Sequence, residues 1–174
     1  YTQAGFMNWL NWQRISKAIG SEFKHVQIDM KSNADALEQG TIVGSATYTT
    51  AGKSLPAYWK ETEIRMDLRV VNPCPDEVAK IKAAGLAIAE VDPKGAFSKH
   101  VGPSMLQGVP ILFGYNARLD IPEDLVYKLV SAVYKEKDNL IKVDVGFTPM
   151  AKDFIGMQAQ GINANPQIPV HPGL

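Results

Sequence analysis

Helix-like and strand-like apolar patterns alternate along this chain, and this alternation is the strongest constraint on its fold. Helical spacing or helix-start signals mark residues 6–19, 34–39, 56–59, 73–84 and 125–136, whereas 25–30, 41–46, 65–71, 86–91 and 109–117 have the composition or period of strands. Alternating elements of this kind favour a mostly parallel sheet with helices on both faces. The sequence therefore predicts an α/β fold in which ligands bind beside the carboxyl ends of strands.

Composition excludes several classes of function. The chain has 174 residues, and its 18 basic and 18 acidic side chains cancel to a net charge of zero. A neutral chain has no general attraction for nucleic acid or for an anionic membrane, so we expect no nucleic-acid partner. A single cysteine excludes an internal disulfide framework.

The motif content favours binding over catalysis. The chain contains no GxGxxG, no GxxxxGK[ST] and no GxSxG, and its three histidines stand apart without metal-ligand spacing. We therefore expect no catalytic residues, no metal and no cofactor. The best nucleophile candidate is Cys74, which sits at a predicted helix N-terminus where a thiolate would be stabilised. The alternative interpretation is a small residue placed between two prolines.

The loop after the predicted buried strand 41–46 carries groups that suit a small polar or anionic ligand. It offers hydroxyls, backbone N–H groups, a glycine that permits close approach and a cation. A plain turn with capping threonines is the competing interpretation. Asn8, at the start of the first helix, is a further candidate. The predicted ligand-binding residues are Asn8, Tyr48, Thr49, Thr50, Gly52 and Lys53.

Three arginines are candidates for holding a carboxylate. Arg65, Arg69 and Arg118 each carry a guanidinium group that pairs with a carboxylate in bidentate fashion. Each of them, taken alone, is more often an ordinary surface charge.

Three stretches resemble one known family. Residues 36–42 (ALEQGTI) resemble an A-L-x-x-G-x-(I/V) segment, 120–130 (DIPEDLVYKLV) resemble a D-L-P-E-D-L-V-Y-x-L helix start, and 168–173 (IPVHPG) resemble an I-P-x-H-P-G signature. Together they are similar to the TAXI family, the TRAP-associated extracytoplasmic substrate-binding proteins of bacterial tripartite transporters. The resemblance extends thinly from about Gly5 to Leu174.

The resemblance implies a periplasmic, non-enzymatic receptor of a TRAP-type transporter. Such a receptor captures a small organic acid and delivers it to the membrane permease subunits. It implies a periplasmic-binding-protein-like lobe over residues 1–118 and a C-terminal helical return segment over 119–174. The first lobe would precede Tyr1, and two copies could associate through the surface left bare by its absence. The aromatic opening of the chain departs from the family and favours a larger or more apolar acid, whereas His171 and Pro172 have structural roles by this comparison.

Two other classes of function remain open at this point. One is a small α/β enzyme with Cys74 as nucleophile, which fast alkylation of that thiol would support. The other is a protein-interaction module, which a large exposed apolar patch without a polar-lined pocket would favour.

Overall fold

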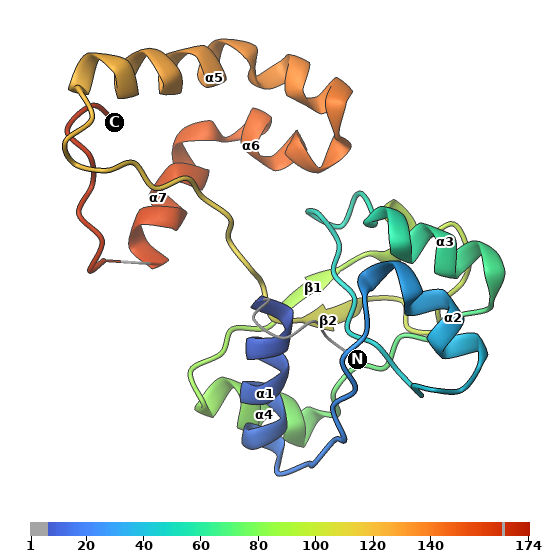
Figure 1. Cartoon of the computed structure of the whole chain (residues 1–174). Helices are drawn as coiled ribbons and strands as arrows, with labels where there is room; N and C mark the ends of the chain where they lie inside the picture. The colour runs from blue at the N-terminus through green and yellow to red at the C-terminus, as the bar shows by residue number, and fades with distance from the viewer. Residues whose placement is uncertain (1–6, 165) are drawn as a thin grey trace. The chain divides into compact units, whose positions relative to one another are not determined.

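A computed structural model describes residues 7–164 and 166–174 of the chain, and it divides into two compact units (Figure 1). The first unit is Tyr1–Ile111 and the second is Leu112–Leu174. The first contains α1 (Met7–Ile19), α2 (Asn33–Glu38), α3 (Ala57–Arg65), α4 (Pro75–Ala83), β1 (Ala89–Val91) and β2 (Leu106–Gly108). The second contains α5 (Glu123–Val143), α6 (Thr148–Lys152) and α7 (Phe154–Ala164). Short 3-10 turns lie at Met30–Ser32, Pro93–Gly95 and Val145–Phe147.

The predicted fold class is wrong. The part of the chain that the structure describes has a single two-stranded sheet, in which β1 and β2 pair antiparallel with Glu90 opposite Gln107. About half of the residues are helical. No mostly parallel sheet flanked by helices is present among the described residues, so the periplasmic-binding-protein-like lobe predicted for 1–118 is not found.

Four of the five predicted strands do not form, and the fifth forms only at its end. Residues 25–30, 41–46, 65–71 and 109–117 contain no β-strand, and Val43, expected to be buried on both faces, is fully exposed. The predicted strand 86–91 is reduced to Ala89–Val91. The physical reason is that a strand needs a hydrogen-bonding partner, which the alternation of one segment does not supply.

The helices follow their local signals more closely. α1 ends before Gly20, whose φ of +72° is a left-handed conformation that favours glycine, and Gly85 closes α4 in the same way. α4 begins with Pro75 and has Asp76 and Glu77 in its first turn, as the helix dipole favours.

The core of the first unit is a small apolar cluster. Its buried members are Leu55, Trp59, Phe97, Val101 and Leu106. α3 contributes Trp59 to this cluster, and its buried Glu63 accepts hydrogen bonds at the carboxylate from the backbone N–H groups of Ser98 (2.7 Å) and Lys99 (2.9 Å). A buried carboxylate with two such donors is satisfied and fixes the loop that carries residues 98–103.

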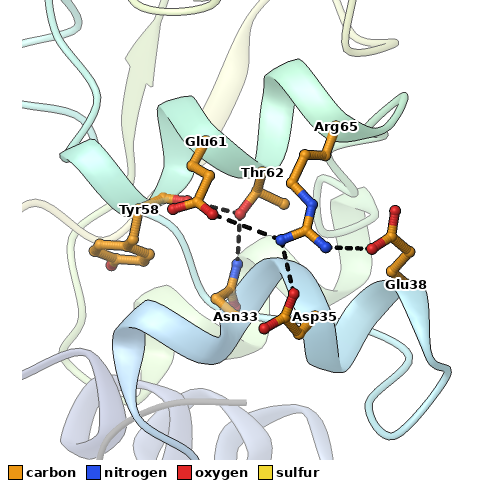
Figure 2. Close-up of polar contacts among 7 residues, drawn as sticks. All are labelled: Asn33, Asp35, Glu38, Tyr58, Glu61, Thr62 and Arg65. Atoms are coloured by element: carbon orange, nitrogen blue, oxygen red, sulfur yellow. Dashed lines mark hydrogen bonds and ion pairs between the residues drawn. The ribbon is translucent and has the colours of Figure 1, made fainter.

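A polar junction joins α2 to α3 (Figure 2). The fully buried Asn33 donates from Nδ2 to Thr62 Oγ1 (3.1 Å), and Thr62 donates to the Tyr58 carbonyl (2.7 Å). Beside this junction, the Arg65 guanidinium pairs with Glu38, with Asp35 at 2.7 Å and with Glu61 at 3.5 Å. The two helices are therefore held by a cation that three carboxylates surround.

The second unit packs α5 against α6 and α7. Val126, Ala151 and Phe154 are buried, and the Phe154 ring meets Tyr134 edge-on at 5.3 Å. His171 accepts from the Gly173 N–H at Nδ1 (3.0 Å), and its Nε2 lies 3.1 Å from the Ile121 carbonyl. This second contact makes Nε2 the protonated nitrogen and ties the C-terminal segment to the approach to α5.

Candidate functional site

The predicted ligand loop contains a tight hairpin turn. The Thr50 N–H donates to the Ser54 carbonyl (3.0 Å), and the Lys53 N–H donates to the Thr50 carbonyl (2.9 Å). The two residues between Thr50 and Lys53, Ala51 and Gly52, have φ values of 52° and 67°. Positive φ at both central positions is the geometry of a type I′ turn. A Cβ at Gly52 would lie 2.5 Å from Val91 Cγ1. The backbone at Gly52 therefore packs closely against β1.

The six predicted binding residues differ widely in their exposure. Asn8 lies half-buried in the first turn of α1, Tyr48 and Thr49 are half-buried, Thr50 and Lys53 are exposed, and Gly52 is buried. None of them lines the two grooves of the first unit, one beside Arg69 and one beside α1. Their role in ligand binding therefore stays a prediction.

The three candidate arginines differ in their acidic partners. Arg65 is occupied by its three acidic partners, and hydrogen bonds to Asp35 and then Glu38 raise the pKa of Arg65 above its ordinary value. Arg118 is occupied by a bidentate pair with Asp120, at 2.9 Å from Nε and 2.7 Å from Nη2. Arg69 has no acidic partner among the described residues.

Arg69 also lines a groove of about 550 Å³ on the first unit. The walls are two irregular segments, 69–72 and 100–103, and a hydrogen bond from the Val70 N–H to the Val101 carbonyl (2.9 Å) joins them. The lining residues are Arg69, Val70, Val71, Asn72, His100, Gly102 and Pro103.

Asn72 fixes one end of this groove. Its Nδ2 donates to the Met105 carbonyl (2.8 Å), and its Oδ1 accepts from the Gln107 N–H (3.0 Å). Both ends of the amide are used, so Asn72 holds the groove wall against the segment that leads into β2 and is not a free ligand group.

The groove has the charge of an anion site. Arg69 contributes a permanent cation, His100 contributes an imidazole that can donate a hydrogen bond, and none of the lining residues is acidic. Gly102, with φ of +102°, leaves the aliphatic part of Arg69 uncovered, since a Cβ there would sit 3.5 Å from Arg69 Cγ. The arrangement can bind a carboxylate through the guanidinium group.

Sequence reasoning named Arg69 but missed His100 and the groove. The two residues lie 31 positions apart, and they line the same groove because the segment expected as a strand, 65–71, is joined to residues 100–103 by the Val70–Val101 hydrogen bond. The alternating apolar pattern of 65–71 was the available signal that this segment would pack along one side, with Leu68 and Val70 on the core.

Cys74 occupies a helix-capping position. It is the exposed N-cap of α4, its N–H donates to the Glu77 carboxylate (2.8 Å), and its carbonyl accepts from the Val78 N–H (2.9 Å). These contacts are those of a helix start and add nothing to the nucleophile interpretation.

No group of three or more His, Cys, Asp or Glu side chains in the described part of the chain is placed to hold a metal ion. No described helix combines the length and apolar character needed to cross a bilayer. No protein-family model, curated protein or solved structure matches this chain.

Proposed function

We propose that this protein is a non-enzymatic binding protein for a small carboxylate-bearing solute, which it holds in the Arg69 groove. The observation that carries the proposal is that Arg69, unlike Arg65 and Arg118, has no acidic partner among the described residues and faces a groove without acidic walls. A guanidinium group in such a setting recognises a carboxylate by two parallel hydrogen bonds. His100 supplies a second donor from the facing segment.

The transport role is a second part of the same proposal, and its support is the sequence resemblance alone. The three stretches that resemble TAXI proteins support a periplasmic receptor that delivers an organic acid to TRAP-type permease subunits. The groove supports acid binding independently of that resemblance. Acid binding in this groove does not require the predicted parallel-sheet lobe, which the described residues lack.

Removing the Arg69 charge tests the proposal. Acetate, succinate, glutamate and benzoate are titrated into the full chain, into Arg69→Ala and into the control Arg14→Ala, with isothermal titration calorimetry as the readout. Arg14 is an exposed arginine of α1 that lines neither groove.

We expect at least one acid to bind the native chain and Arg14→Ala, with affinity reduced roughly tenfold or more in Arg69→Ala. That loss corresponds to about 1.5–3 kcal/mol for a hydrogen bond to a charged group. Equal affinity in Arg69→Ala, or no binding of any acid to the native chain, would overturn the proposal.

Exposed apolar residues on α5 support a second candidate, a protein-interaction role. Leu125, Tyr127 and Leu129 are each more than half exposed although they lie on a helix that packs by Val126. Replacing Leu125 and Leu129 with glutamate leaves the core untouched. A concentration-dependent dimer that this double variant abolishes would support self-association, and a native chain that is monomeric at all concentrations would count against it.

A further inference from the structure

A second groove, separate from the Arg69 groove, lies along one face of α1. Its volume is about 590 Å³, and it includes Trp9, Trp12, Gln13, Ser16, Lys17 and Gly20, which are spaced at intervals of three and four residues. This spacing places them on one side of the helix. The opposite wall is the segment 21–25, which carries Glu22, Phe23 and His25.

The turn after α1 sends the chain back along this face. Gly20 has φ of +72°, and the Ser21 N–H donates to the Ser16 carbonyl at 3.1 Å. The Phe23 ring then lies 5.0 Å from Trp12, and the His25 ring lies 6.5 Å from Trp9. Residues of the returning segment therefore meet the helix in reverse order, with Glu22 near the Lys17 end and His25 near the Trp9 end.

The groove consequently has an aromatic part and a charged part. The aromatic part offers tilted rings against which a further planar ring packs by its face or edge. The charged part carries one cation, Lys17, and one anion, Glu22, and neither has an ion-pair partner among the described residues. Two opposite charges beside a set of rings match a ligand that carries a ring, an ammonium group and a carboxylate.

We propose that the groove between α1 and residues 21–25 binds an aromatic amino acid, with its ring against Trp12 and Phe23. Lys17 pairs with the ligand carboxylate, and Glu22 pairs with its ammonium group. The site shares no residue with the Arg69 groove, so the inference stands whether or not the proposed acid-binding function is correct.

The three tryptophans of the chain provide the readout. Trp9 and Trp12 line this groove, whereas Trp59 is buried in the core with its indole N–H directed to the Ala46 carbonyl at 3.4 Å. Proton–nitrogen NMR spectra of the nitrogen-15-labelled full chain resolve the three indole N–H signals. Unlabelled tryptophan, indole-3-propionate, tryptamine and alanine are titrated in turn, which removes the ammonium, the carboxylate or the ring from the ligand.

We expect tryptophan to move the Trp9 and Trp12 signals saturably and to leave Trp59 in place. Omitting either charge weakens binding about two- to fivefold, as for a solvent-exposed ion pair, and alanine produces no shift. Lys17→Gln weakens tryptophan binding by a similar factor. Lys24→Gln, which changes an exposed residue of segment 21–25 that does not line the groove, has no effect. No saturable shift with tryptophan, a shift that includes Trp59 equally, or unchanged affinity in Lys17→Gln would overturn the proposal.

Discussion

At the residue scale, Gly52 shows how backbone conformation and packing act at one position. It holds φ of +67° in the hairpin turn and lies buried against Val91 of β1. Gly40 has nearly the same φ, +69°, but nothing lies within 4 Å of the position its Cβ would take. The two glycines therefore share the conformational requirement and differ in the space available.

We predict that Gly52→Ala destabilises the protein more than Gly40→Ala. Both substitutions place a side chain in the left-handed region, at about 1–2 kcal/mol, and only the first also forces a methyl group into Val91, at about 1–3 kcal/mol more. Urea denaturation of the two variants measures the difference. Equal losses of unfolding free energy would mean that Gly52 is not packed on β1.

The residues of the Arg69 groove could be predicted only in part from the sequence. The residue types that suit a carboxylate were visible, but an arginine already paired with acids looks the same in sequence as an unpaired one. Arg65 pairs with Asp35 and Glu38 across 30 and 27 positions, and Arg69 lines the same groove as His100 across 31. Such separations are set by packing, which no local pattern specifies.

At the scale of elements, the helices were more predictable than the strands because their signals are local. Capping residues, first-turn acids and closing glycines lie within the helix or next to it, as α1 and α4 show. Residues 65–71 carry the alternation of a strand, and Leu68 and Val70 do face the core, yet the segment forms no sheet. Alternation therefore reports one-sided burial, whereas a sheet also requires a partner strand.

The junction of α2 and α3 gives a prediction at this scale. Because the pKa of Arg65 is raised, its contribution to folding is present through the neutral and mildly alkaline range and is lost only in strong alkali. Arg65→Ala leaves Asp35, Glu38 and Glu61 together without their cation. We expect its melting temperature to fall by a few degrees.

The matched control is Arg118→Ala, which removes an exposed pair with Asp120. Thermal unfolding followed by circular dichroism should show little change for this variant, because such pairs contribute little to stability. A fall as large as that of Arg65→Ala would contradict the role assigned to the α2–α3 junction.

At the scale of the whole molecule, the chain consists of two units that each pack their own elements. Residues 112–118, at the start of the second unit, are irregular and exposed throughout, with Phe113 at 83% and Tyr115 at 105% relative exposure. Exposed chain without regular hydrogen bonding is the preferred substrate of proteases.

We predict that limited digestion with chymotrypsin cuts first after Phe113 or Tyr115. Trp59 and Phe97 are buried and should resist cleavage, and the exposed Tyr127 lies within helix α5, whose hydrogen-bonded backbone is a poorer substrate. Mass spectrometry of the earliest fragments identifies the site. A first cut outside residues 112–118 would show that the boundary between the units lies elsewhere.

The central claim, that Arg69 holds the carboxylate of a small solute, is tested most directly by NMR of the arginine Nε–H signals during titration with succinate, glutamate and benzoate. Arg65 and Arg118 already pair with acids and act as internal references. We predict that the Arg69 signal moves saturably with at least one acid while the signals of Arg65 and Arg118 stay in place. An Arg69 signal that none of the acids moves, or three signals that drift together without saturation, would contradict the claim.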